Sequence, residues 1–272
     1  MALLRICERA GLGDGANAEL SFEHTGTYPI TISDPFAEAD ERRLEWYFED
    51  WLSMPFTNTV EAQAIAASTV TYGQLGTVAQ QQRRWEQAED YYQKALALKI
   101  EFNDRYGQAS TYHQLGMMAE KQQRWAQAED YYQKALALKI EFNDRYSQAL
   151  TYHNLGIVAQ GQQRWEQAED YYQKALAIYI DFNDRYWQAG TYHQLGSVAQ
   201  EQQRWAQALD YYLKALPVVI EFNDEFHLDM VLRSLARLWQ ASQDPNLPAA
   251  VGAVLKLPVE QVEEMLGKLN QG

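Results

Sequence analysis

Cysteine is almost absent from this sequence of 272 residues, which contains only Cys7. A single cysteine excludes an internal disulfide and any zinc site built on cysteine pairs. Long hydrophobic runs are missing as well: the sequence has no stretch of about 18 apolar residues, the length that could cross a membrane. The start of the chain also lacks the basic segment and apolar run of a secretory signal. We therefore expect a soluble, cytoplasmic protein.

Positive charge is scarce. Lys and Arg number 23 against 37 Asp and Glu, which gives a formal net charge of −14. Such a chain repels nucleic acid phosphates and anionic lipids, so we expect neither nucleic acid nor a membrane as partner. The acidic residues are spread along the chain, which is typical of a solvated surface. Hydrophobic residues make up 47% of the chain, enough to form a buried core.

Signatures of catalysis are also missing. The chain has no glycine-rich phosphate loop, no HExxH and no GxSxG. Paired carboxylates such as Glu89 and Asp90 recur, but they stand near Lys94 on an amphipathic segment. A solvated face with salt bridges one helical turn apart explains that pattern. The sequence therefore predicts a protein that is not an enzyme and uses no cofactor.

The sequence does contain one segment that is repeated with a period of 40 residues. The same period separates Trp85, Trp125, Trp165 and Trp205, and also Gly76, Gly116, Gly156 and Gly196. A fixed period of about 20–50 residues is typical of solenoid proteins. Within each copy, apolar residues recur at steps of three, four and seven, which indicates two helices per copy. We call them helix A and helix B.

Asn-Asp pairs predict where these helices begin and end. The pair Asn103-Asp104 returns in every later copy. Asparagine tolerates the left-handed backbone conformation that ends a helix, and aspartate caps the helix that follows. In the second copy we therefore expect helix A at about 104–121 and helix B at about 125–142. Gly116 is small where the two helices must approach closely.

The repeated positions resemble the signature of the tetratricopeptide repeat (TPR), in which a Leu-Gly pair is followed by Ala, an aromatic residue and Ala. At its spacing stand Leu115, Gly116, Ala128, Tyr132 and Ala135. Ala119 replaces the usual aromatic residue and the closing proline is absent, as in the longer repeats of kinesin light chains and spindle-orientation adaptors. The resemblance covers about 60–240. It implies an all-α TPR α-solenoid, a right-handed superhelix of helix pairs.

We assign residues 57–230 to an array of four such repeats, and residues 1–56 to a separate strand-and-helix segment. Within that segment, alternating apolar residues predict short strands, and a stripe of aromatic residues predicts a helix. The strands are expected at 3–8, 18–22 and 28–33, and the helix at 41–53. Residues 27–36 and 44–63 resemble the leading segment of cyanobacterial-type proteins that carry a caspase-like CHAT domain.

Residues 231–272 are expected to form a degenerate repeat and a C-terminal helical cap. Terminal units of a solenoid must differ from the others, because their outer face meets water. In the fourth copy, Leu209 and Leu213 replace the Glu and Gln of the earlier copies. They lie one helical turn apart. We predict that both are buried beneath the helices of residues 247–269.

Differences between the copies are concentrated on helix A, whereas helix B barely changes over the first three. In the second copy the varying residues are Gly107, Ser110, Gln114, Met117 and Lys121. Their spacing of three, four, three and four residues places them on one face of the helix. We call these positions, with their counterparts 40 and 80 residues later, the stripe. In TPR arrays helix A lines the concave groove, so the resemblance implies a groove whose wall chemistry differs from copy to copy. Neutral drift at exposed positions is the alternative interpretation of the stripe.

The stripe and a recurring histidine supply the candidate partner-binding residues. They are His113, His153, His193, Gln114, Asn154, Gln194, Met117, Ile157, Ser197, Lys121 and Trp187. Amide side chains can bond a peptide backbone, and apolar side chains can form pockets for its side chains. A metal site is not expected, because equivalent histidines of neighbouring repeats lie roughly 10 Å apart, too far to share a zinc ion.

These features predict a non-catalytic scaffold that holds a peptide or partner protein in the concave groove. Two other interpretations stay open. One is a regulatory or sensor subunit that controls an effector enzyme, such as a CHAT-type protease, through residues 1–56. The other is oligomerisation through the near-identical repeats.

Overall fold

The computed structural model describes residues 21–22, 26–27 and 59–270, and the chain divides into two compact units, Met1–Gln63 and Ala64–Gly272. In the first unit, β1 (Ser21–Phe22) and β2 (Gly26–Thr27) pair antiparallel. The predicted strand at 18–22 overlaps β1. The other predictions for this segment lie outside the described residues: strands at 3–8 and 28–33, and a helix at 41–53.

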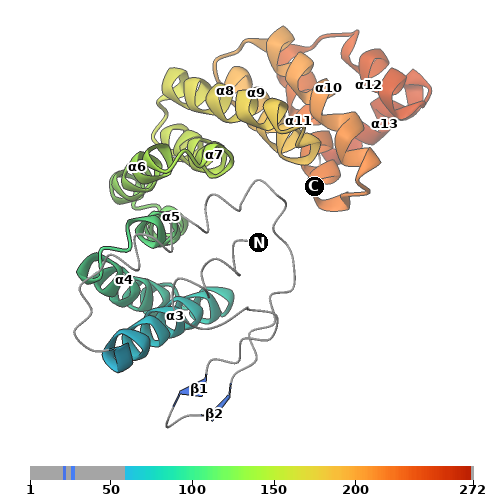
Figure 1. Ribbon diagram of the computed structural model, residues 1–272. Coiled ribbons are helices and arrows are strands. Elements are labelled where there is room, and N and C mark those ends of the chain that lie inside the picture. The colour runs from blue at the N-terminus through green and yellow to red at the C-terminus, as the bar shows by residue number, and fades with distance from the viewer. Residues whose placement is uncertain (1–20, 23–25, 28–58, 271–272) are drawn as a thin grey trace. The chain divides into compact units, whose positions relative to one another are not determined.

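The other described elements are α-helices that follow one another in antiparallel pairs (Figure 1). They are α3 (Thr59–Gln81), α4 (Trp85–Glu101), α5 (Arg105–Lys121), α6 (Trp125–Glu141), α7 (Arg145–Gly161), α8 (Trp165–Asp181), α9 (Arg185–Glu201), α10 (Trp205–Glu221), α11 (Glu225–Ser242), α12 (Leu247–Leu255) and α13 (Val259–Leu269). Odd-numbered helices from α3 to α11 are helix A of successive repeats, and α4, α6, α8 and α10 are helix B. The predicted all-α solenoid of helix pairs is confirmed.

Local backbone chemistry sets the ends of each helix, as the sequence predicted. Asn103 adopts a left-handed conformation with φ of 55°, and the Asp104 carboxylate accepts a hydrogen bond from the Gly107 N–H at 2.7 Å. The predicted limits of α5 and α6 are correct to within one residue. The turn between helices A and B uses the same conformation at Gln123, with φ of 56°. Glutamine rarely adopts it, so the sequence did not signal this turn.

Helices A and B of one repeat approach most closely where a glycine faces a tyrosine. Tyr172 of α8 is completely buried, and a Cβ atom on Gly156 of α7 would lie 2.5 Å from its ring. Gly116 and Tyr132 make the same contact one repeat earlier, at 2.6 Å. The predicted close approach at Gly116 is therefore confirmed, and a tyrosine ring fills the space that the missing side chain leaves.

We expect Gly156→Ala to lower the free energy of unfolding by about 1–3 kcal/mol, because the added methyl group must displace a buried ring. Gly190→Ala in α9 is the matched control, since no atom lies within 4 Å of a Cβ atom there. That variant should gain up to about 1 kcal/mol from the better helix propensity of alanine. Urea denaturation measures both changes. Equal stability of the two variants would contradict a tight contact at Gly156.

Polar bridges connect each repeat to the next. Arg164 before α8 donates to Glu129 of α6 at 2.6 Å, and the Tyr146 hydroxyl of α7 donates to Asp184 at the start of α9, also at 2.6 Å. The same bridges recur 40 residues later. The partners stand 35 and 38 residues apart, so each bridge joins neighbouring repeats. In an array held by such contacts, stability is approximately a sum of terms for individual repeats and for the contacts between neighbouring repeats.

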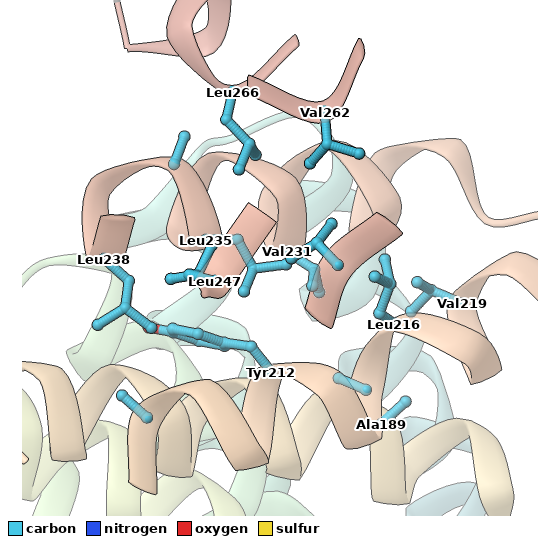
Figure 2. Close-up of a cluster of buried hydrophobic side chains, with 14 of the residues drawn as sticks. Ala189, Tyr212, Leu216, Val219, Val231, Leu235, Leu238, Leu247, Val262 and Leu266 are labelled. Carbon is cyan, nitrogen blue, oxygen red and sulfur yellow. The ribbon is translucent and has the colours of Figure 1, made fainter. Parts of the chain in front are cut away.

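The C-terminal helices close the array with an apolar cluster. Figure 2 shows Val262 and Leu266 of α13 above Leu247 of α12, with Tyr212 of α10 below them. All four side chains are buried. The short helices expected after the degenerate repeat are therefore present as α12 and α13, and they cover the last helix pair.

The prediction for Leu209 and Leu213 is confirmed in part. Both side chains of α10 pack against the apolar cluster that includes Leu247 and Val262, but they are half-buried rather than fully buried. Leucines at the positions that hold Glu and Gln in earlier copies therefore suit the last repeat, which packs against the cap.

Candidate binding surface on helix A

Stripe residues lie on one face of α5, α7 and α9, and polar contacts connect that face from helix to helix. Nδ2 of Asn154 on α7 lies 3.4 Å from Nε2 of His113 on α5. One repeat later, Nε2 of Gln160 donates to Oγ of Ser197 on α9 at 3.2 Å. Through Asn154 and Ser197, each contact joins a stripe residue to the neighbouring helix A.

Most candidate residues of the stripe are partly accessible. Half-buried side chains are those of Gln114, Met117, Asn154, Ile157, Trp187, Gln194 and Ser197, whereas Lys121 is exposed. Met117 and Ile157 rest on the buried clusters between helix pairs. The Oε1 atom of Gln114 is buried and has no hydrogen-bond partner. A buried acceptor without a donor is uncommon in folded proteins.

The two histidines of α5 and α7 lie beneath the stripe. His113 is 6% exposed and His153 is 7% exposed. Each ring packs against the buried tyrosine of its own repeat, with centroids 5.3 Å apart, namely Tyr132 and Tyr172. Burial lowers the pKa of His113 to about 3 and that of His153 to about 4, so both are neutral at pH 7. They support helix packing and leave little surface for a partner.

Trp187 combines packing with partial exposure. Its ring stacks on Tyr179 of α8, with centroids 5.8 Å apart and planes 16° apart. It also packs against the cluster of Ala149 and Ile178. As a stripe residue, Trp187 was predicted to offer its apolar side chain to a partner. The structure places much of this side chain in the contact between α8 and α9 instead, so its replacement would also affect stability.

A buried lysine beside the stripe helices was not predicted from the sequence. Lys139 of α6 is 7% exposed, and its ammonium group donates to the Ser147 carbonyl oxygen at 3.2 Å and to Thr151 Oγ1 at 2.7 Å. Burial lowers its pKa to about 8, although the nearby Asp144 carboxylate acts in the opposite direction. The only signal in the sequence was that one helix B position holds Lys99, Lys139, Tyr179 and Val219.

The described residues offer no ready metal site. Within 59–270 and the two short strands, no group of three or more His, Cys, Asp or Glu side chains is placed to hold a metal ion. None of the helices in that part of the chain is both long and apolar enough to span a bilayer. The stripe carries a mixture of amide, apolar and charged groups.

Comparison with known proteins agrees with this architecture. The profile of the tetratricopeptide repeat family matches residues 67–141, 107–181 and 147–221, and each match ends where a helix B ends. No curated protein matches the chain. Among solved structures, BtubC (BKLC) from P. vanneervenii is 18% identical, with a TM-score of 0.62 over 85% of this chain and 93% of that one.

Two further solved structures share the fold. The apo form of RapI is 15% identical, with a TM-score of 0.62 over 80% of this chain and 78% of its own. MamA is 21% identical, with a TM-score of 0.52 over 75% of this chain and 96% of its own. The resemblance of residues 27–36 and 44–63 to a CHAT-protein leader lies outside the family match and stays a prediction. Because the family profile covers 67–221, more than half of the sequence, the chain belongs to the tetratricopeptide repeat family.

Proposed function

We propose that the protein is a non-catalytic scaffold that binds a peptide or a partner protein along the stripe. Repeat proteins of this kind use the extended surfaces created by their stacked units for binding. The observation that supports this function is a face on α5, α7 and α9 whose side chains differ from repeat to repeat. Helix B, by contrast, is nearly identical in the first three repeats.

The chemistry of the stripe suits an extended or helical peptide. Half-buried Met117 and Ile157 provide apolar contacts for its side chains, and Gln194 and Asn154 provide amide groups for its backbone. The half-buried side chain of Gln114 adds an amide group to the same face.

Gln114→Ala is expected to weaken partner binding by at least about 1 kcal/mol, the usual threshold for an interface residue that matters. Thermal stability should not fall, because the change removes a buried acceptor that has no donor in the fold. The partner is first captured from a lysate of the source cells on the full-length protein and identified by mass spectrometry. Calorimetry with the purified partner then gives the affinities.

Gln133→Ala is the matched control, because Gln133 is an exposed glutamine of α6. A partner that is retained by wild type and by Gln133→Ala, but is lost or weakened with Gln114→Ala, supports the stripe as the binding surface. Equal retention by Gln114→Ala would contradict that role. Loss with Gln133→Ala alone would move the binding surface to helix B.

A further inference from the structure

A second surface of the array runs along the turns that join each helix B to the next helix A. Four segments have nearly the same sequence there: IEFNDRY at 100–106 and 140–146, IDFNDRY at 180–186 and IEFNDEF at 220–226. Arg145 of one segment pairs with Asp181 of the next at 2.7 Å. The ring of Tyr146 packs against that of Phe182, with centroids 5.5 Å apart. Equivalent contacts join the other segments, so the four form one connected surface, which we call the turn edge.

Apolar side chains of the turn edge are exposed to a degree that is uncommon elsewhere on the array. Most of the exposed large hydrophobic residues in the described part of the chain belong to it, namely Ile100, Ile140, Tyr146, Ile180, Phe182, Tyr186, Ile220, Phe222 and Phe226. The isoleucines are 38% to 53% exposed, and Phe226 is 70% exposed. Exposed apolar side chains that gather in this way mark an interaction site.

The residues that precede these isoleucines differ between the copies, although they are buried. The pairs in the last three segments' helices are Leu138 with Lys139, Ile178 with Tyr179, and Val218 with Val219. The fourth copy has therefore diverged within its core, yet it keeps the exposed Ile220 and Phe222. Recent duplication alone does not account for this pattern, whereas a contact made by the exposed side chains does.

The turn edge is also acidic. Each of its first three segments carries two carboxylates and one arginine. The fourth segment carries Glu221, Asp224 and Glu225 and has neither lysine nor arginine. Carboxylates therefore outnumber cations in every segment. Such a surface repels a second copy of itself and anionic lipid headgroups, and it attracts a partner that carries positive charge.

The backbone of the turns offers little to an extended peptide. In 140–146, the N–H groups of Phe142, Asn143 and Asp144 already donate to carbonyl oxygens of the preceding helix, and that of Arg145 donates to the Asn143 carbonyl oxygen. A peptide that binds in an extended form gains affinity from backbone hydrogen bonds with its receptor. A helix satisfies its backbone groups internally and can bind through side chains alone. The turn edge therefore suits a helical partner.

We propose that the turn edge binds an amphipathic helix of a partner protein, with lysine or arginine residues beside its apolar face. The isoleucines and aromatic rings of the edge contact the apolar face of that helix. The exposed carboxylates, such as those of Glu221 and Glu225, attract the flanking cations. The turn edge consists of residues other than those of the stripe, so the inference does not depend on the proposed function.

The test uses the full-length protein and a cross-linked helical peptide of about 20 residues, with leucines on one face and lysines beside them. A second peptide has glutamate in place of each lysine. Fluorescence anisotropy at physiological ionic strength should show that the lysine peptide binds at least about tenfold more tightly. Ile180→Thr should weaken its binding at least about fivefold, the effect expected of an interface residue that matters.

Val259→Thr is the matched control, because Val259 is an exposed β-branched residue of α13 outside the turn edge. It should leave the affinity unchanged, and so should Gln114→Ala on the stripe. Binding that survives Ile180→Thr, that falls equally with Val259→Thr, or that needs Gln114 would overturn the proposal. Equal binding of the two peptides, or none of the lysine peptide, would also contradict it. A dimer of the wild type in sedimentation that Ile180→Thr abolishes would show that a second copy occupies the edge instead.

Discussion

Tyr172→Ala is expected to lower the free energy of unfolding by about 3–5 kcal/mol, the range for removal of a buried aromatic side chain. The Tyr172 ring is completely buried in the cluster between the third and fourth repeats and touches Gly156 and His153. Removal of the ring leaves a cavity between two helices, and the surrounding backbone cannot easily move to fill it. Because each repeat is held by its neighbours, the loss should affect both sides of the array.

Tyr172→Phe separates packing from hydrogen bonding. The phenol hydroxyl donates to Oε1 of Gln160 at 2.9 Å, and loss of that single bond should lower stability by about 0.5–1.5 kcal/mol. Urea denaturation followed by circular dichroism measures both variants. Equal losses for the alanine and phenylalanine variants would mean that the hydroxyl, rather than the ring, holds the repeats together.

Lys139→Met is expected to raise the free energy of unfolding at pH 7 by about 1–3 kcal/mol. Burial lowers the pKa of Lys139 from 10.5 to about 8, which at about 1.4 kcal/mol for each pKa unit corresponds to roughly 3 kcal/mol of destabilisation by the charged form. Methionine keeps the length of the side chain without the charge. The position tolerates apolar residues, since Tyr179 and Val219 occupy it in later repeats.

The advantage of Lys139→Met should shrink as the pH rises. Below about pH 8 the lysine is charged in both the folded and the unfolded protein, so the wild type bears the full cost of burying the charge. Between about pH 8 and 10.5 the folded protein loses the proton first, and wild-type stability therefore rises relative to the variant. Taking the difference between the two proteins at each pH removes the titration of groups that they share.

Lys134→Met provides the control on the same helix. Lys134 is exposed and pairs with Asp130 one turn away at 2.7 Å, so its replacement should change stability by less than about 1 kcal/mol. Chemical denaturation at pH 7 and at pH 9.5 gives the required comparison. A variant Lys139→Met that is less stable than wild type at pH 7 would show that the two hydrogen bonds of the ammonium group outweigh the cost of its burial.

The fold was predictable because its determinants are local and recur. Asn103 and Asp104 mark a helix end and a cap through their own backbone chemistry, and four copies of the pair repeat the signal. Gly116 indicated a close helix contact, and the Tyr132 ring fills it. The position of the stripe followed from spacing alone, because residues three and four apart share a helix face.

Burial between repeats was less predictable, because it depends on which residues of the next repeat lie above a side chain. His113 and Lys139 carry polar groups and read as surface residues, yet both are buried where helices from two repeats meet. The reverse holds for Ile140 and Ile180, which are 53% and 51% exposed at the ends of helix B although their type suggests a core. Neither outcome follows from periodicity within a single helix.

The spacing of the inter-repeat bridges has a consequence for how the protein's length can change. Arg164 reaches Glu129 and Tyr146 reaches Asp184, and the same pair of bridges returns 40 residues later. An extra 40-residue unit inserted at Asp144 would therefore meet matching partners on both sides, and removal of one unit would bring matching partners together. The number of repeats can therefore change in whole units without redesign of either bridge.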